Sequence, residues 1–99
     1  MMMLVTFQLG EDNPNFVESL KALGNWSNRI EGAWVLESAL NPRQVRDNLA
    51  PHMKPEDRLF VARLSGTWSG RNMGGGFPEW MERRDFATGS KPVVTTSGV

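Results

Sequence analysis

The feature that most constrains the fold is a short apolar run near the middle of the chain. Four apolar residues, 33–36, follow Gly32 and precede the polar pair at 37 and 38. Such a run predicts a strand, and a strand that is apolar on both faces must be covered on both faces. We therefore take the stretch 28–38 as the centre of one small sheet, with other segments packed on either side.

The length of the chain limits it to one hydrophobic core region. A chain of 99 residues with 39% apolar residues buries only about two thirds of its unfolded surface. We expect a single domain over residues 1–85 and a flexible tail over residues 86–99. A second copy of the chain that covers the remaining apolar surface is also expected, so we predict a homodimer.

Composition removes several classes of function. The 11 basic and 11 acidic side chains balance, which argues against strong sequence-blind attraction to nucleic acid but leaves local patches open. The chain has no cysteine, so disulfide scaffolds, thiolate metal sites and cysteine nucleophiles are excluded. The single histidine, His52, excludes a multi-histidine metal site within one chain, and spacing suggests no serine partner for it.

The apolar start of the chain is too short to span a membrane and carries no basic region before it, so it reads as a strand. We expect a cytoplasmic protein without membrane contact. Alternation of apolar and polar residues predicts that first strand over residues 3–9. A short strand is expected over 25–30, and a further strand, again apolar on both faces, over 58–64.

Two Asn-Pro pairs predict helix starts, because asparagine caps free N–H groups and proline suits the first helical turn. The first helix is expected over residues 14–23 and ends before Gly24. The second begins after Asn41 and continues toward Met53, with an end or a kink at Pro51. Residues 65–76 read as a loop, and residues 77–84 as a short docking helix. Residues 93–95 are a candidate edge strand.

If both β-α-β connections have the same handedness, the first two helices lie on one face of the sheet. The other face then needs a cover, and the candidates are a second subunit and the chain's own C-terminal part. The residues alone predict an α/β sandwich of this kind.

Several segments together resemble small proteins related to the CRISPR-associated Cas-two family, including its SinR-like relatives. The resemblance covers roughly residues 4–70 and rests on Phe-Gln-Leu at 7–9, on 33–38, on Arg-Asp-Asn-Leu at 46–49, on 57–61 and on Gly-Thr-Trp-Ser-Gly at 66–70. It implies a ferredoxin-like β-α-β-β-α-β domain, here with a short C-terminal helix or strand, that dimerises through its sheets.

The family's proposed nuclease site is an aspartate at the end of the first strand, one from each subunit, that holds a divalent metal. The matching position here is Gln8, and an amide is a poorer magnesium ligand than a carboxylate. Only Glu11 and Asp12 in the following loop are candidate substitutes. We expect no metal and no cofactor, with magnesium or manganese only if a divergent nuclease site exists.

Eight arginines offer possible phosphate contacts. Arg43, Arg46 and Arg71 are candidate nucleic-acid-binding residues, although a salt-bridged surface is the alternative for the first two. Arg63 interrupts an apolar strand face, so it either pairs with a carboxylate at a dimer interface or reaches solvent at a sheet edge.

The C-terminal aromatic residues are candidate interface residues. Trp68 and Trp80 lie where they could be exposed, and packing across the sheet is the alternative. Phe77, the third candidate, lies on the expected apolar side of the helix over residues 77–84. Three hypotheses follow. The first is a non-catalytic homodimeric binding or assembly protein linked to nucleic-acid metabolism or defence, with a protein or nucleic-acid partner. The others are a metal-dependent endonuclease acting on RNA or DNA, and a protein-interaction or inhibitor module that uses residues 77–84.

Overall fold

The computed structural model describes residues 1–87. The predicted strand at 93–95 and all of the predicted tail except Phe86 and Ala87 lie outside this range. The elements, in chain order, are β1 (Met2–Gln8), α1 (Pro14–Lys21), β2 (Asn25–Ile30), β3 (Ala33–Glu37), α2 (Pro42–Leu49), the short 3₁₀ helix η1 (Ala50–His52), β4 (Arg58–Arg63) and α3 (Phe77–Glu82).

The four strands form one antiparallel sheet in the order β2-β3-β1-β4. Because β1 and β3 occupy the two central positions, the two β-α-β connections each skip over a neighbouring strand. This is the ferredoxin-like arrangement, as predicted. Gly32, with a φ of +74°, lies in the turn that joins β2 to β3, where the left-handed conformation favours glycine.

Both predicted helix caps are present. The side chain of Asn13 accepts a hydrogen bond from the Phe16 N–H at 3.0 Å. Asn41 and Gln44 form a reciprocal capping box, with side-chain to backbone bonds of 2.8 and 2.9 Å. Local hydrogen bonding therefore fixes where α1 and α2 begin. The α2 helix ends at Leu49, next to the proline-containing turn η1, which settles the alternative between an end and a kink.

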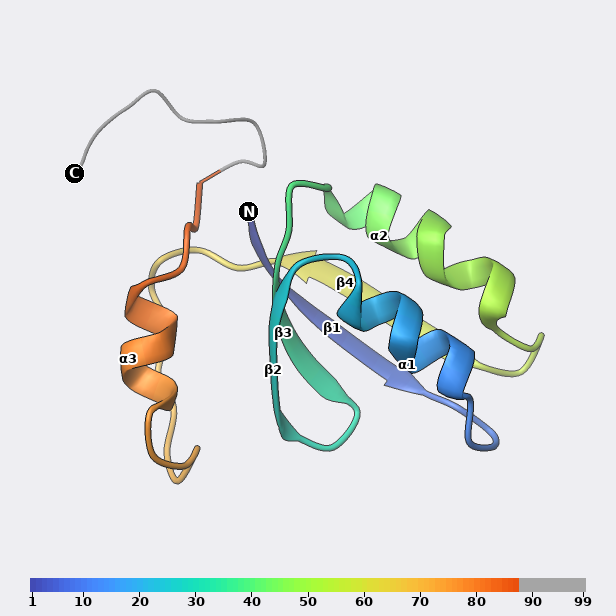
Figure 1. The fold of residues 1–99 in the computed structure, drawn as a ribbon, viewed down its shortest axis with the longest axis horizontal. Helices are drawn as coiled ribbons and strands as arrows, with labels where there is room; N and C mark the ends of the chain where they lie inside the picture. Colours follow the sequence, from blue (N-terminus) through green and yellow to red (C-terminus); the bar gives the residue numbers. More distant parts are fainter. Residues whose placement is uncertain (88–99) are drawn as a thin grey trace.

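The helices α1 and α2 cover one face of the sheet, called here the first face (Figure 1). The core between these helices and the sheet consists of Met3, Val5, Phe16, Leu20, Trp34, Leu36, Val45 and Leu49. Seven of these eight side chains are fully buried, and Trp34 is 6% exposed. Burial of such side chains contributes about 1.5–3 kcal/mol each, so this layer is the main source of the fold's stability.

The opposite face, called here the second face, is covered by the chain's own C-terminal part. The α3 helix lies on the other side of β2 and β3 from α1 and α2 (Figure 1). Phe77 and Met81 of α3 bury Met2, and Leu64 and Phe86 pack at the margin of this second cluster. One of the two predicted covers is therefore present within a single chain. No helix within residues 1–87 has the length and apolar content needed to cross a membrane.

Candidate functional site

The second face is built of parallel rows of side chains, and only some of the rows are covered. Direct register partners lie on the same side of a sheet. The row Glu37–Met2 lies next to Leu64, whose N–H bonds to the Met2 carbonyl, and α3 packs over it. At the other end, one row crosses all four strands. This open row consists of Ile30, Ala33, Thr6 and Phe60.

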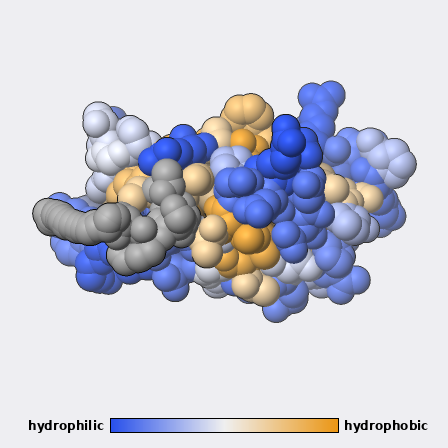
Figure 2. All heavy atoms as spheres, turned by 90° about the horizontal axis from the view of Figure 1, so that it is seen from above, coloured by the Kyte–Doolittle hydropathy of each residue, from blue (hydrophilic) through white to orange (hydrophobic). Residues whose placement is uncertain are grey.

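The two ends of the open row are the most exposed large apolar side chains of the described residues. Phe60 on the edge strand β4 is 62% exposed, and Ile30 on the edge strand β2 is 53% exposed. Between the open row and the covered row, Leu4 pairs with Ala62. Because exposed large apolar side chains lie at both of its ends, the open row is a candidate interaction surface. In the view of Figure 2, apolar surface gathers near the middle of the molecule, with hydrophilic surface on either side.

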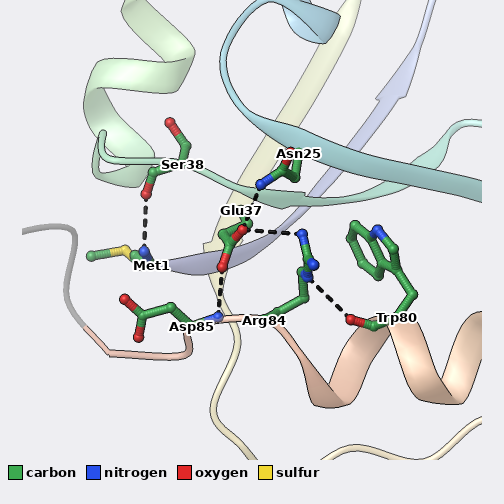
Figure 3. Close-up of polar contacts among 7 residues, drawn as sticks. All are labelled: Met1, Asn25, Glu37, Ser38, Trp80, Arg84 and Asp85. Atoms are coloured by element: carbon green, nitrogen blue, oxygen red, sulfur yellow. Dashed lines mark hydrogen bonds and ion pairs between the residues drawn. The ribbon is translucent and has the colours of Figure 1, made fainter. Parts of the chain in front are cut away.

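The C-terminal segment that covers the second face is attached to the sheet through one carboxylate. Glu37, at the end of β3, accepts hydrogen bonds from Arg84 Nη1 at 3.2 Å, from Asn25 Nδ2 at 2.8 Å and from the backbone N–H of Asp85 at 2.6 Å (Figure 3). The side chains of Glu37 and Arg84 are only 18% and 14% exposed. The Arg84 guanidinium also lies 4.6 Å from the centroid of the Trp80 ring.

The interaction between Glu37 and Arg84 was not predicted from the sequence. Glu37 was interpreted only as part of the polar break that ends the central strand, and Arg84 only as one of eight arginines. They are 47 residues apart in the chain. A single carboxylate at the end of an otherwise apolar strand face was the available signal, because a charge at such a position needs a partner.

The end of β1 borders an open recess of about 510 Å³. Gln8, Glu11, Asp12 and Glu31 line it, and all four are exposed. The Glu11 carboxylate lies 3.2 Å from Lys54 Nζ, so one of the candidate metal ligands already has a cationic partner. Within residues 1–87, no group of three or more histidine, cysteine, aspartate and glutamate side chains is placed to hold a metal ion.

The loop after β1 is tied to the turn before β4 by Asp57. Its carboxylate accepts the backbone N–H of Lys54 and that of Gly10, each at 2.9 Å. The hydrogen bond from Lys54, followed by that from Gly10, holds the pKa of Asp57 below its usual value. This contact fixes the wall of the recess beside Glu11.

The predicted nucleic-acid-binding arginines are not brought together. Arg43 and Arg46 lie on α2, over the first face, and Arg46 forms an ion pair with Asp47 at 2.8 Å. Arg71 lies in the loop before α3, and this loop packs on the second face through Trp68. The two groups therefore belong to opposite sides of the sheet.

The predicted interface residues mostly pack within the chain. The rings of Trp68 and Trp80 lie on either side of Phe77 in sequence, with centroids 6.1 and 6.4 Å from it, in the cluster that covers the second face. Packing across the sheet, one of the two alternatives, accounts for their positions. Arg63 is exposed and donates to the Phe86 carbonyl at 3.2 Å.

His52 does have a serine neighbour, contrary to the expectation from spacing. Its Nε2 lies 3.0 Å from the Ser19 hydroxyl oxygen, because α1 packs beside α2 and η1 directly follows α2. Asn13 Nδ2 donates to the His52 carbonyl, which fixes the turn. Among the hydrogen bonds of residues 1–87, none joins the His52 ring to a carboxylate, so the pair lacks the third group that orients a catalytic histidine.

The fold and its surfaces define a ferredoxin-like α/β domain with a short C-terminal helix over part of the second face. Comparisons of the chain with protein-family models, with curated proteins and with solved structures found no match.

Proposed function

We propose that this chain is a non-catalytic binding or assembly protein that forms a homodimer through the open row of its second sheet face. The observation that carries the proposal is the 62% exposure of Phe60 on a sheet face that its own C-terminal helix leaves partly uncovered. Exposed large apolar side chains at both ends of one row, here Phe60 and Ile30, are typical of an interaction surface.

The arrangement of the open row suits a second copy. Phe60 and Ile30 lie on the two outermost strands, at equal distance in strand order from the boundary between β3 and β1. A two-fold axis parallel to the strands at that boundary would place Phe60 of one copy over Ile30 of the other, and the reverse. Closed two-fold symmetry uses the same patch twice, and burial of each phenylalanine would contribute about 1.5–3 kcal/mol.

A role in nucleic-acid metabolism or defence, with a protein or nucleic-acid partner, is part of the proposal. Its support is the sequence resemblance to the Cas-two family over residues 4–70, together with the ferredoxin-like strand order.

The homodimer is tested by light scattering and sedimentation of the purified chain at micromolar concentration. We expect a mass of two chains for the wild type and of one chain for Phe60→Glu, because the interface would then bury a carboxylate without a partner. Arg43→Glu, a change to the same acidic residue on the exposed side of α2, is the control and should remain a dimer. A wild-type mass of one chain would refute the proposal.

A metal-dependent nuclease is the second candidate, favoured by the recess at the end of β1 that holds Glu11, Asp12 and Glu31. RNA and duplex DNA are incubated with the protein and magnesium or manganese, in parallel with a Glu11→Ala/Asp12→Ala variant. Under the first proposal, wild type and variant leave both substrates equally intact. Metal-dependent cleavage that the double substitution abolishes would instead establish the nuclease.

A further inference from the structure

A second surface feature lies at the opposite edge of the sheet from Phe60. A groove of about 270 Å³ runs between the edge strand β2 and the helix α3. We call it the β2-edge groove. Trp26, Asn28 and Arg29 line it from β2, and Trp80 and Arg83 line it from α3. It combines the open edge of a strand with aromatic and cationic side chains from a second element.

The charge of the groove is positive. Its lining includes two arginines and no carboxylate. The guanidinium of Arg29 is held in place by bonds to the carbonyls of Met73 at 3.0 Å and Gly75 at 3.2 Å, which satisfy its donors without neutralising it. Arg83 is exposed and forms no ion pair within residues 1–87. The groove is therefore suited to an anionic ligand.

The tryptophan rings of the groove are poorly placed to stack on nucleic-acid bases. The Trp26 ring packs against Trp34 with a centroid distance of 4.9 Å, and Lys21 Nζ lies 5.2 Å from the centroid of the Trp26 ring. The Trp80 ring already has Arg84 at 4.6 Å and Phe77 at 6.4 Å. Stacking platforms for single strands need open ring faces, so the rings contribute apolar walls and not base contacts.

The open edge of β2 supplies the remaining element of recognition. Among the described strands, β2 pairs only with β3, so its outer edge has no strand partner. Such an edge can add an extended peptide through main-chain hydrogen bonds, while flanking pockets select alternate side chains. The irregularity between Ser27 and Ile30 limits regular pairing to the first half of β2, which begins at Asn25.

We infer that the β2-edge groove binds an extended segment of a partner protein that carries acidic side chains at alternate positions, directed toward Arg29 and Arg83. Residues 88–99 contain Lys91 and no acidic residue, so their sequence lacks the side chains that this site would select. The inference does not depend on the homodimer, because the groove is lined by residues of a single chain and its lining includes neither Phe60 nor Ile30.

The test uses the full chain, immobilised, and a displayed library of random octapeptides. We expect the selected peptides to be enriched in aspartate and glutamate at alternate positions. A synthetic peptide of the selected sequence should then shift the backbone amide NMR signals of residues 25–29 and 80–83. By fluorescence anisotropy, Arg83→Glu should weaken its binding about tenfold or more, as expected for loss of a charged contact. The control Arg43→Glu should change the affinity less than twofold.

Each other outcome overturns the inference. A library without enrichment shows that the groove is not a peptide site. If the selected peptides instead shift the amide signals of the strand around Phe60, recognition belongs to the open row. Oligo-uridine or oligo-thymidine 15-mers that displace the peptide and shift the signals of Trp26 and Arg83 identify a nucleic-acid site. The Phe60→Glu variant should bind the peptide normally, so failure of the homodimer and failure of this site are distinguishable.

Discussion

Glu37 is the residue on which the attachment of α3 to the sheet most depends. Its two oxygens accept hydrogen bonds from two side chains and one backbone N–H, and all three donors come from segments distant in sequence. Loss of a hydrogen bond to a mostly buried charged group costs about 1.5–3 kcal/mol. The side chain is 18% exposed, so solvent screening of the ion pair is limited.

We predict that Glu37→Gln lowers the free energy of unfolding by about 2 kcal/mol, because the amide keeps the shape of the side chain but loses the charge that pairs with Arg84. Urea unfolding at neutral pH measures the change. Glu79→Gln, the same substitution at an exposed position of α3, is the matched control and should stay within about 0.5 kcal/mol of wild type. Equal midpoints of urea unfolding for the two variants would show that the Glu37–Arg84 ion pair contributes nothing to stability.

At the scale of the elements, the junction between α1 and β2 holds Gly24, which among the described glycines has the least room for a Cβ beside backbone atoms. A Cβ atom at Gly24 would collide with the carbonyl group of Glu37 on the neighbouring strand β3. The sequence indicated Gly24 as the end of the first helix, which is its local role. Its second role, close approach of two backbones, depends on the register of β2 with β3 and has no local sequence signal.

We predict that Gly24→Ala destabilises the fold by about 2–4 kcal/mol, because the obstructing atoms are backbone and cannot move aside without breaking strand pairing. Gly66→Ala is the matched control, since a Cβ there would meet no atom within 4 Å. Thermal unfolding followed by circular dichroism compares the two. A Gly24→Ala variant as stable as the Gly66→Ala variant would contradict the predicted collision.

The helices and strands were largely predictable because their signals are local. Asn13 and Asn41 cap their helices through bonds to residues three positions later, and the predicted element bounds lie within two residues of those observed, apart from the predicted continuation of the second helix toward Met53 and the start of the central strand. The attachment of α3 was predictable only as one of two alternatives. Whether the C-terminal part or a second subunit covers the sheet depends on contacts such as that between Met2 and Phe77, which join the two ends of the described chain.

At the scale of the whole molecule, the second face is divided between a covered and an open part. The predicted α/β sandwich follows from strands that are apolar on both faces, and residues on both faces are indeed apolar. The candidate interaction surfaces were less predictable. The open row takes one residue from each strand, and the β2-edge groove combines residues about 50 positions apart, so both exist only after the strands are in register.

The homodimer also has a consequence for the stability of the whole molecule. If two folded chains associate and unfolded chains do not, the midpoint of thermal unfolding rises with protein concentration. We expect this rise for the wild type and its loss in Phe60→Glu, with calorimetry at several concentrations as the measurement. A midpoint that is independent of concentration in both proteins would argue for a single folded chain.

The two faces of the sheet also separate the four indoles of the chain. Trp26 and Trp34 lie together on the side of α1 and α2, whereas Trp68 and Trp80 lie around Phe77 on the side of α3. Replacing either pair by phenylalanine would leave intrinsic fluorescence that reports on a single layer. Detachment of the C-terminal helix could then be followed optically while the rest of the molecule remains folded.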